Sequence, residues 1–277
     1  MSIAITIAWW SKIDVSALFE TAEIRRGELW RLLSSTLLHV NFLHLAFNVY
    51  WLLLFGALIE RKFGHAKTAI LLIFFAVASS SFDFAFSQGG VGLSGVVYGL
   101  FGLLWILARR DPSFQGAVNK NTILLFLAWF VFCIVTAIEN VFVVGNVAHG
   151  AGLIFGVMVG YAITTPRYRL TITATIIPLV FIGLLGATFL RPVFNASSRN
   201  GDDEVQWGYD ALLANRNDAA ARWLQYAVSH QPQNAVAWFN LSIAYSRLGN
   251  KDRAANALQK AHDLDPQYSL QQSNPEE

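Results

Sequence analysis

Four polar residues of the types that catalyse acyl transfer lie inside long apolar stretches of this chain. Ser94 follows Gly92 and Leu93, His149 follows Ala148, and His44 and Asn48 stand four residues apart. A serine hydroxyl becomes a nucleophile when a base takes its proton, and histidine is a common base. The oxyanion that forms then needs hydrogen-bond donors. His44, Asn48 and the backbone N–H of Ser94 are the candidates for that role.

Glycines next to Ser94 and His149 predict that the helices carrying them approach closely. Residues at spacings of three, four and four share one helix stripe, and this stripe holds His149, Gly152, Gly156 and Gly160. Because glycines let helix backbones come together, we expect the stripe to pack on Gly95, Gly99 and Gly102. That packing would bring Ser94 within hydrogen-bond reach of His149. Tyr98, one turn beyond Ser94, is expected to stack on the imidazole.

Other chemistries fit the pattern less well. No Asp or Glu stands beside His149, so the expected unit is a Ser–His dyad. Gly95 directly follows Ser94, which breaks the Gly-x-Ser-x-Gly elbow of soluble hydrolases. The zinc motif His-Glu-x-x-His is absent, and His39 and His44, five residues apart, are a poor metal pair. We therefore predict no metal and no cofactor.

Each residue also has a plainer interpretation. A lone serine in a membrane helix is more often a packing residue. An ionisable side chain within a bilayer is costly and is by default functional. The joint occurrence of Ser94, His149, His44 and Asn48 at one depth on three helices favours a catalytic site.

The composition is that of a membrane protein followed by a polar domain. The chain has 277 residues, 55% hydrophobic and only 14% charged, with a mean hydropathy of +0.43, whereas soluble domains carry about 25% charged residues. Residues 1–192 have 13 Lys/Arg and 8 Asp/Glu, a net charge of +5, and residues 193–277 have 7 and 10, a net charge of −3. The basic residues are scattered in pairs, so we predict no nucleic-acid partner. The single Cys133 cannot form an intrachain disulfide.

The apolar runs predict an all-α bundle of six transmembrane helices. Their approximate bounds are 33–59, 67–86, 93–109, 121–142, 146–165 and 170–190. A further apolar stub, Ser2 to Trp10, is too short to span a bilayer, which takes about 20 residues. It is either an interfacial segment or the remainder of a first helix. Asp83 and Glu139 lie in or beside apolar runs; we expect both near the membrane interfaces and assign neither a function.

Basic residues in the short loops predict the orientation. On the side where Ser94 lies, the loops at 87–92 and 143–146 have no Lys or Arg, and the other segments hold Lys12, Arg25, Arg26, Arg31, Arg191 and Arg199. The opposite side holds Arg61, Lys62, Lys67, Arg109, Arg110, Lys120, Arg167 and Arg169. That side is predicted to be cytoplasmic, which places the opening of the active site and the C-terminal tail on the non-cytoplasmic side.

The tail repeats with a period of 34 residues, pairing Ala220 with Ala254, Leu224 with Leu258 and Pro232 with Pro266. This period resembles the tetratricopeptide helix–turn–helix pattern, and a plain helical hairpin is the alternative. The predicted organisation is a membrane domain at 1–192, a linker at 193–200, two repeats at 201–268 and a disordered tail at 269–277. Two repeats are few for independent stability, so we expect docking to the membrane domain, self-association or a protein partner.

Taken together, the motifs resemble the rhomboid family of intramembrane serine proteases, over roughly residues 28–165. The matching residues are Trp30-Arg31, His39, His44, Asn48, Gly56, Glu60-Arg61, Gly64, Gly92-Leu93-Ser94-Gly95, Tyr98, Gly102, Ala148-His149 and Gly152. The resemblance implies that Ser94 is the nucleophile, His149 the base, and His44 and Asn48 oxyanion donors. It implies a supporting role for His39 and a membrane-surface loop around Trp30-Arg31. It also implies single-span membrane proteins as substrates.

The chain departs from the family pattern in its first transmembrane helix, which is nearly absent. A catalytically silent membrane adaptor or chaperone of the same fold is the alternative function, although such relatives usually lack the Ser or the His that this chain keeps. A transporter is a third and weaker hypothesis, because the polar groups cluster near one side and not at the midplane.

Overall fold

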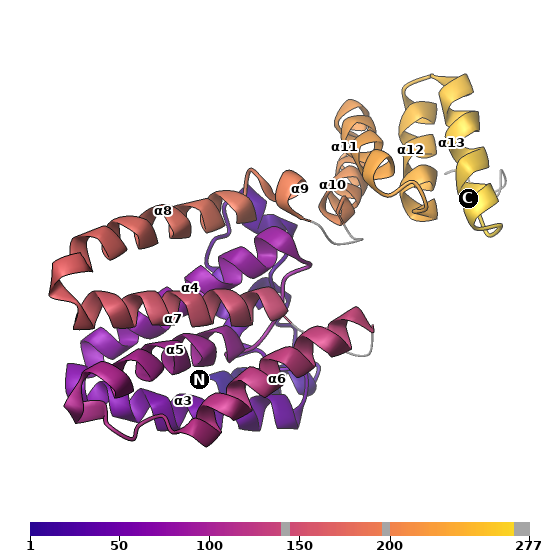
Figure 1. Cartoon of the computed structure of the whole chain (residues 1–277). Helices are drawn as coiled ribbons and strands as arrows, with labels where there is room; N and C mark the ends of the chain where they lie inside the picture. The colour runs from indigo at the N-terminus through magenta and orange to yellow at the C-terminus, as the bar shows by residue number, and fades with distance from the viewer. Residues whose placement is uncertain (140–144, 196–199, 269–277) are drawn as a thin grey trace. The chain divides into compact units, whose positions relative to one another are not determined.

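The computed structural model describes residues 1–139, 145–195 and 200–268. Two compact units divide the chain, Met1–Asn195 and Ala196–Glu277. The described residues form helices and turns without a strand, so the predicted all-α class is confirmed (Figure 1). The predicted disordered tail at 269–277 and residues 196–199 of the predicted linker lie outside the described residues.

Six helices build the core of the first unit. They are α3 (Phe42–Phe63), α4 (His65–Phe86), α5 (Ser94–Arg110), α6 (Lys120–Ile138), α7 (Asn146–Thr164) and α8 (Arg169–Ala187). Five of them, all but α5, are long and apolar enough to cross a membrane, so the predicted count of six spans is wrong by one. With 17 residues, α5 is shorter because it begins at the glycine-rich turn and ends at a pair of arginines. It packs among α3, α4 and α7 (Figure 1), where most of its residues are buried.

The predicted bounds of the first and last spans need correction, and the first span ends at Phe63 and not near residue 59. The first span begins at Phe42 and not near residue 33, because the Asn41 side chain accepts the His44 N–H (2.9 Å) and caps the helix there. A side-chain cap of this kind starts a helix at a defined residue, even where the apolar run begins earlier in the sequence. Helix α6 ends at Ile138, and the predicted end near 142 lies outside the described residues. Helix α8 ends at Ala187, before a short helix α9 (Arg191–Phe194).

The N-terminal segment consists of the residues that precede α3. It contains α1 (Ser2–Trp10), η1 (Ser16–Leu18), η2 (Ala22–Arg26), α2 (Arg31–Ser34) and η3 (Ser35–Leu37). In α1 the hydroxyls of Ser2 and Thr6 donate to the Leu37 carbonyl (2.6 and 3.1 Å), and the Trp10 indole donates to the His39 carbonyl (2.9 Å). The apolar stub is therefore a nine-residue helix packed on the turn that carries His39.

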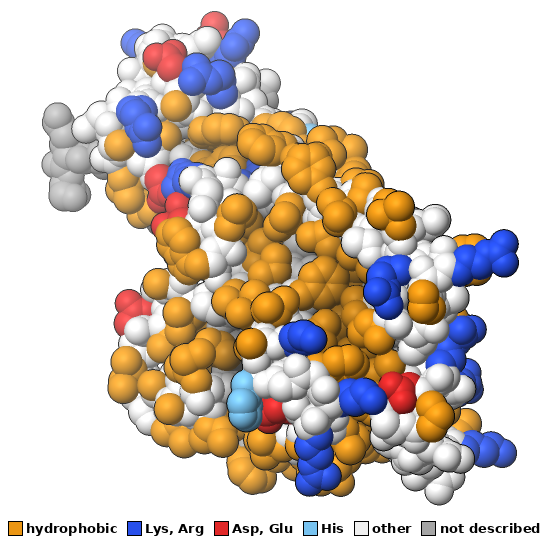
Figure 2. All heavy atoms as spheres, turned by 90° about the vertical axis from the view of Figure 1, so that its left-hand side faces the viewer, with side chains coloured by type: hydrophobic (Ala, Val, Ile, Leu, Met, Phe, Trp, Pro, Cys, Tyr) orange, Lys and Arg blue, Asp and Glu red, His pale blue; other side chains and the backbone are white. Residues whose placement is uncertain are grey.

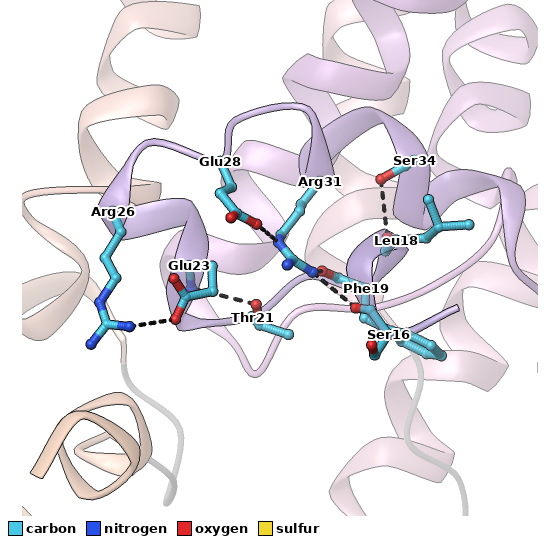
Figure 3. A network of polar contacts seen from close by, with 9 residues as sticks. All are labelled: Ser16, Leu18, Phe19, Thr21, Glu23, Arg26, Glu28, Arg31 and Ser34. Carbon is cyan, nitrogen blue, oxygen red and sulfur yellow. Dashed lines mark hydrogen bonds and ion pairs between the residues drawn. The ribbon is translucent and has the colours of Figure 1, made fainter. Parts of the chain in front are cut away.

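Arg31 holds the rest of this segment together (Figure 3). Its guanidinium donates to the Glu28 carboxylate (2.6 Å) and to the carbonyls of Ser16 (2.9 Å) and Phe19 (3.1 Å). Arg31 is only 8% exposed, so these charge-assisted bonds are stronger than a surface ion pair. They fix the chain on both sides of Glu20.

Lys and Arg side chains gather at the end of the first unit where α7 gives way to α8. Figure 2 shows that end, with basic side chains standing out from a largely hydrophobic surface. They include the arginines that close α5: Arg109 lies over the Trp105 ring (5.0 Å) and Arg110 over the Tyr161 ring (4.6 Å). An excess of basic residues at one end is the feature from which orientation is inferred.

The second unit consists of two helical hairpins. Helices α10 (Asp202–Leu213) and α11 (Asn217–His230) form the first, and α12 (Ala235–Arg247) and α13 (Lys251–Leu264) the second. Small and large residues interlock between them: a Cβ at Gly208 would overlap the Leu224 side chain. Ala220, Leu224 and Ala227 are fully buried, as the 34-residue period predicts.

Glycines bring the backbones of α5 and α7 into direct contact, as predicted. A Cβ at Gly152 would overlap the carbonyl oxygen of Gly95, and a Cβ at Gly156 would overlap that of Gly99. A Cβ at Gly102 would lie 2.6 Å from the Leu153 carbonyl oxygen, while a Cβ at Gly160 would lie 2.7 Å from the Ile106 side chain, so Gly160 does not face a third glycine. No larger residue fits at these positions without separating the helices.

We expect the substitution Gly156→Ala to destabilise the protein by about 1–3 kcal/mol. The new methyl group would press against backbone atoms of α5, which cannot move aside as a side chain can. Gly150→Ala on the same helix is the matched control, since its new Cβ would meet only the Phe130 ring, at 3.5 Å. Thermal unfolding in detergent compares the two variants. Equal melting temperatures would show that the close α5–α7 contact is not required.

Candidate active site

Ser94 is the first residue of α5, and the turn before it is fixed by two hydrogen bonds. The Gly92 N–H donates to the Ser35 carbonyl (3.2 Å), and the Leu93 N–H donates to Nε2 of His39 (3.3 Å). Gly92 has φ +114°, a conformation that glycine adopts without strain. Ser94 is partly exposed, and its position is one where the backbone N–H has no partner within the helix.

His149 lies in the first turn of α7 and is only 3% exposed. The ring of Tyr98 stacks on the imidazole, with centroids 4.6 Å apart and planes at 21°, which is the predicted contact. The Tyr98 hydroxyl donates to the Phe126 carbonyl on α6 (2.9 Å). Tyr98 therefore holds the imidazole between α5 and α7 while its own ring is fixed from α6.

His44 and Asn48 lie on the first turns of α3, and His44 faces the loop that precedes Ser94. A Cβ at Gly92 would come within 2.5–2.8 Å of the His44 imidazole, so the loop backbone lies against that ring. The Asn48 amide donates to the His44 carbonyl (2.9 Å). The rings of His39 and His44 meet edge to face at 4.8 Å, which places His39 between the loop and His44 as a support.

Several buried polar atoms of these residues have no hydrogen-bond partner. Nδ1 of His44, Oδ1 of Asn48 and Nδ1 of His149 are three of the seven such side-chain atoms in the described parts of the chain. Leaving a buried polar atom unpaired costs about 1–3 kcal/mol. A native fold rarely keeps such groups without a reason, and a role in binding or catalysis is one.

The structure brings the predicted site residues to one end of α3, α5 and α7. Gly95 and Gly152 make a close backbone contact, one residue after Ser94 and three after His149. The predicted hydrogen bond between Ser94 and His149 stays a prediction, because no hydrogen bond joins these two described residues, and Nδ1 of His149 has no partner at all. Catalytic hydrogen bonds are often long without substrate and tighten when it binds. Among the described residues no three His, Cys, Asp or Glu side chains gather to hold a metal ion.

Two acids that no sequence motif singles out, Asp83 and Glu20, contact the backbone beside the site. The Asp83 carboxylate accepts the N–H of Ala148 (3.2 Å), the residue before His149. The Glu20 carboxylate accepts the N–H of Gly90 (2.8 Å), in the loop before Ser94. An acidic residue in an apolar run signals a buried partner, but the run itself does not identify that partner.

Comparison with known proteins agrees with this geometry. The Rhomboid domain family matches residues 26–166, just over half of the chain, and a tetratricopeptide repeat matches residues 235–268. The chain therefore belongs to the rhomboid family. With its apolar helices, it is a multi-pass integral membrane protein.

Several curated relatives are similar to this chain. The rhomboid protease GlpG of Klebsiella pneumoniae is 31% identical over 140 residues, which cover 50% of this chain and 49% of that protein. GlpG of Pectobacterium atrosepticum is 32% identical over 152 residues, 53% of this chain and 54% of that protein. The rhomboid protease GluP of Bacillus subtilis is 24% identical over 249 residues, 89% of this chain and 48% of that protein. The chain spans about half the length of the curated relatives it matches.

We expect Tyr98→Leu to slow labelling of Ser94 by a fluorophosphonate about two- to twelve-fold. Loss of a ring pair costs about 0.5–1.5 kcal/mol, and each 1.36 kcal/mol is tenfold in rate. Tyr98→Phe is the matched control, since it keeps the stack on His149 and loses only the bond to Phe126. Equal labelling rates for both variants would exclude an orienting role for the ring.

Proposed function

We propose that this chain is an intramembrane serine endopeptidase that uses a Ser94–His149 dyad. Buried polar atoms without partners on His44, Asn48 and His149, at the same end of the bundle as Ser94, are the observation that carries this proposal. Membership of a family whose relatives are named rhomboid proteases supports it. A packing role for the same residues would leave those buried atoms unexplained.

In the proposed reaction, His149 takes the proton of the Ser94 hydroxyl as its oxygen attacks the carbonyl carbon of the scissile peptide bond. The carbonyl oxygen gains a negative charge, which the His44 imidazole, the Asn48 amide and the Ser94 backbone N–H stabilise. The C–N bond then breaks, and His149 returns the proton to the departing amine. Water, deprotonated by His149, hydrolyses the resulting acyl-enzyme and restores Ser94.

The proposed substrates are single-span membrane proteins, cleaved in or near ends of the transmembrane helix that unwind readily. The absence of Lys and Arg from the loop at 87–92, against the basic opposite end shown in Figure 2, supports an active site that opens to the non-cytoplasmic side. Water for hydrolysis would enter from that side, because Ser94 begins α5 there.

A catalytically silent adaptor or chaperone of the same fold is the second candidate. The tetratricopeptide match favours a binding role for the tail, but binding alone gives no reason for His149 to lie buried against Tyr98. Labelling of Ser94 by a fluorophosphonate separates the two, since an adaptor has no activated serine.

We expect purified protein in detergent to cleave a single-span test substrate, and the Ser94→Ala variant to lose that cleavage. Loss of a catalytic dyad member lowers kcat by several orders of magnitude. Cleavage is measured by detecting the fragments on a gel or by mass spectrometry. Ser113→Ala is the control, because Ser113 is exposed in the segment that follows α5. Equal cleavage by the wild type and Ser94→Ala would exclude this nucleophile.

The tail is proposed to bind substrate or another protein, or to associate with a second copy of the chain. A groove of about 500 Å³ between its hairpins, lined by Gln225, Trp238, Tyr245, Arg253 and Asn256 among others, is suited to this. We expect a chain ending at Asn195 to keep cleaving a short test substrate while its substrate range or oligomeric state changes. Light scattering and a panel of substrates measure both, and no change in either would contradict the proposal.

A further inference from the structure

Glu20 lies directly beneath the glycine loop that leads to Ser94. One oxygen of the carboxyl group accepts the Gly90 N–H (2.8 Å), and the other accepts the Ser35 hydroxyl (3.1 Å). A Cβ at Gly89 would stand only 2.6 Å from the first oxygen. The carboxyl group therefore fills the space under the loop, and Gly89 is small enough to admit it.

Asp83 occupies the other side of the same loop and reaches α7. Its side chain is buried, with 2% exposure, and one oxygen accepts the Ala148 N–H (3.2 Å). Cβ atoms at Gly90 and Gly145 would lie 3.0 and 3.1 Å from its oxygens. One carboxylate thus touches both the loop that leads to Ser94 and the backbone that leads to His149.

Neighbouring contacts hold both acids in place. The Arg31 network of Figure 3 fixes the chain around Glu20. On the other side, Arg191 donates to the Ser87 carbonyl (2.8 Å), lies over the Phe84 ring (3.7 Å) and interacts electrostatically with Asp83. Neither acid takes part in the proposed acyl transfer.

We propose that Glu20 and Asp83 are positioning residues for the reaction: Glu20 sets the loop that leads to Ser94, and Asp83 ties that loop to the helix turn that carries His149. This inference rests on the proposed protease function. Its physical basis is that small displacements of reacting groups, of about 1 Å, cost about 10²-fold in rate.

The charge on the pair makes the arrangement sensitive to pH. Desolvation and the facing carboxyl group of Asp83 raise the pKa of Glu20 to about 8. The fold therefore favours the protonated form of Glu20. The stability that this preference contributes to the folded protein is lost as the pH rises through the raised pKa. Glu20 and Asp83 face each other, and the positive charge of Arg191 lies beside Asp83. Ionising Glu20 adds a second negative charge under the loop, so activity should fall above about pH 8.

The kinetic test uses the full chain in detergent with a single-span test substrate. We expect Glu20→Ala and Asp83→Ala to lower kcat by about 10²-fold with KM unchanged, since neither residue contacts substrate. Glu20→Gln and Asp83→Asn keep an oxygen that accepts the same N–H and should retain most of kcat. Glu23→Gln is the matched control, an acid of the same segment in an exposed ion pair with Arg26. Wild-type kcat in both alanine variants, or a raised KM alone, would overturn the inference.

The pH profile supplies a second readout that holds even if the alanine variants do not fold. The wild type should lose activity between about pH 7 and 9, and Glu20→Gln, which cannot ionise, should keep it. The same alkaline fall in both proteins would overturn the role of Glu20.

Amide hydrogen exchange separates failure of this inference from failure of the proposed function. If the wild type shows no cleavage that depends on Ser94, the protease assignment fails, while exchange still tests the contacts. We expect faster exchange in segments 88–93 and 146–150 of Glu20→Ala and Asp83→Ala, and wild-type exchange in Glu23→Gln. Unchanged exchange in both alanine variants would show that neither carboxylate holds these segments.

Discussion

The contact between the backbones of α5 and α7 is the constraint on which the rest of the site depends. Gly152 and Gly156 lie against the carbonyl oxygens of Gly95 and Gly99, where no side chain fits. Because the contact begins within a turn of Ser94 and His149, it fixes the relative height of the two residues. In a bilayer such packing has to supply the specificity of association, since apolar side chains gain little by leaving lipid for protein.

The remaining elements bring polar groups to this one end. Helix α3 adds His44 and Asn48, the His39 turn holds the N-terminus of α5, and α6 fixes Tyr98 through the Phe126 carbonyl. The N-terminal segment covers the turn from outside and carries Glu20 under the loop. Unpaired polar atoms are thereby concentrated where a substrate carbonyl and water would have to bind, and the stability they cost is offset by the packed helices around them.

Much of this arrangement was predictable because it is local. Helix period and residue type define the glycine stripes, the predicted stacking of Tyr98 on His149 and the paired hairpins of the tail. The start of α3 was missed, because a capping Asn41 inside an apolar run is a weaker signal than hydrophobicity. The length of α5 agrees with the predicted 93–109, but its count as a sixth span does not, because its burial between other helices does not appear in its composition. The partners of Glu20 and Asp83 come from distant segments, so only the tertiary fold identifies them.

A double-mutant cycle on Ser94 and His149 tests the central claim most directly. Cleavage of one single-span substrate is measured for Ser94→Ala, His149→Ala and the double variant, with melting temperatures to show that all three are folded. Residues that act as one catalytic unit are strongly non-additive. We expect each single variant to lose as much activity as the double variant. Independent, additive losses would contradict a dyad held together by the α5–α7 contact.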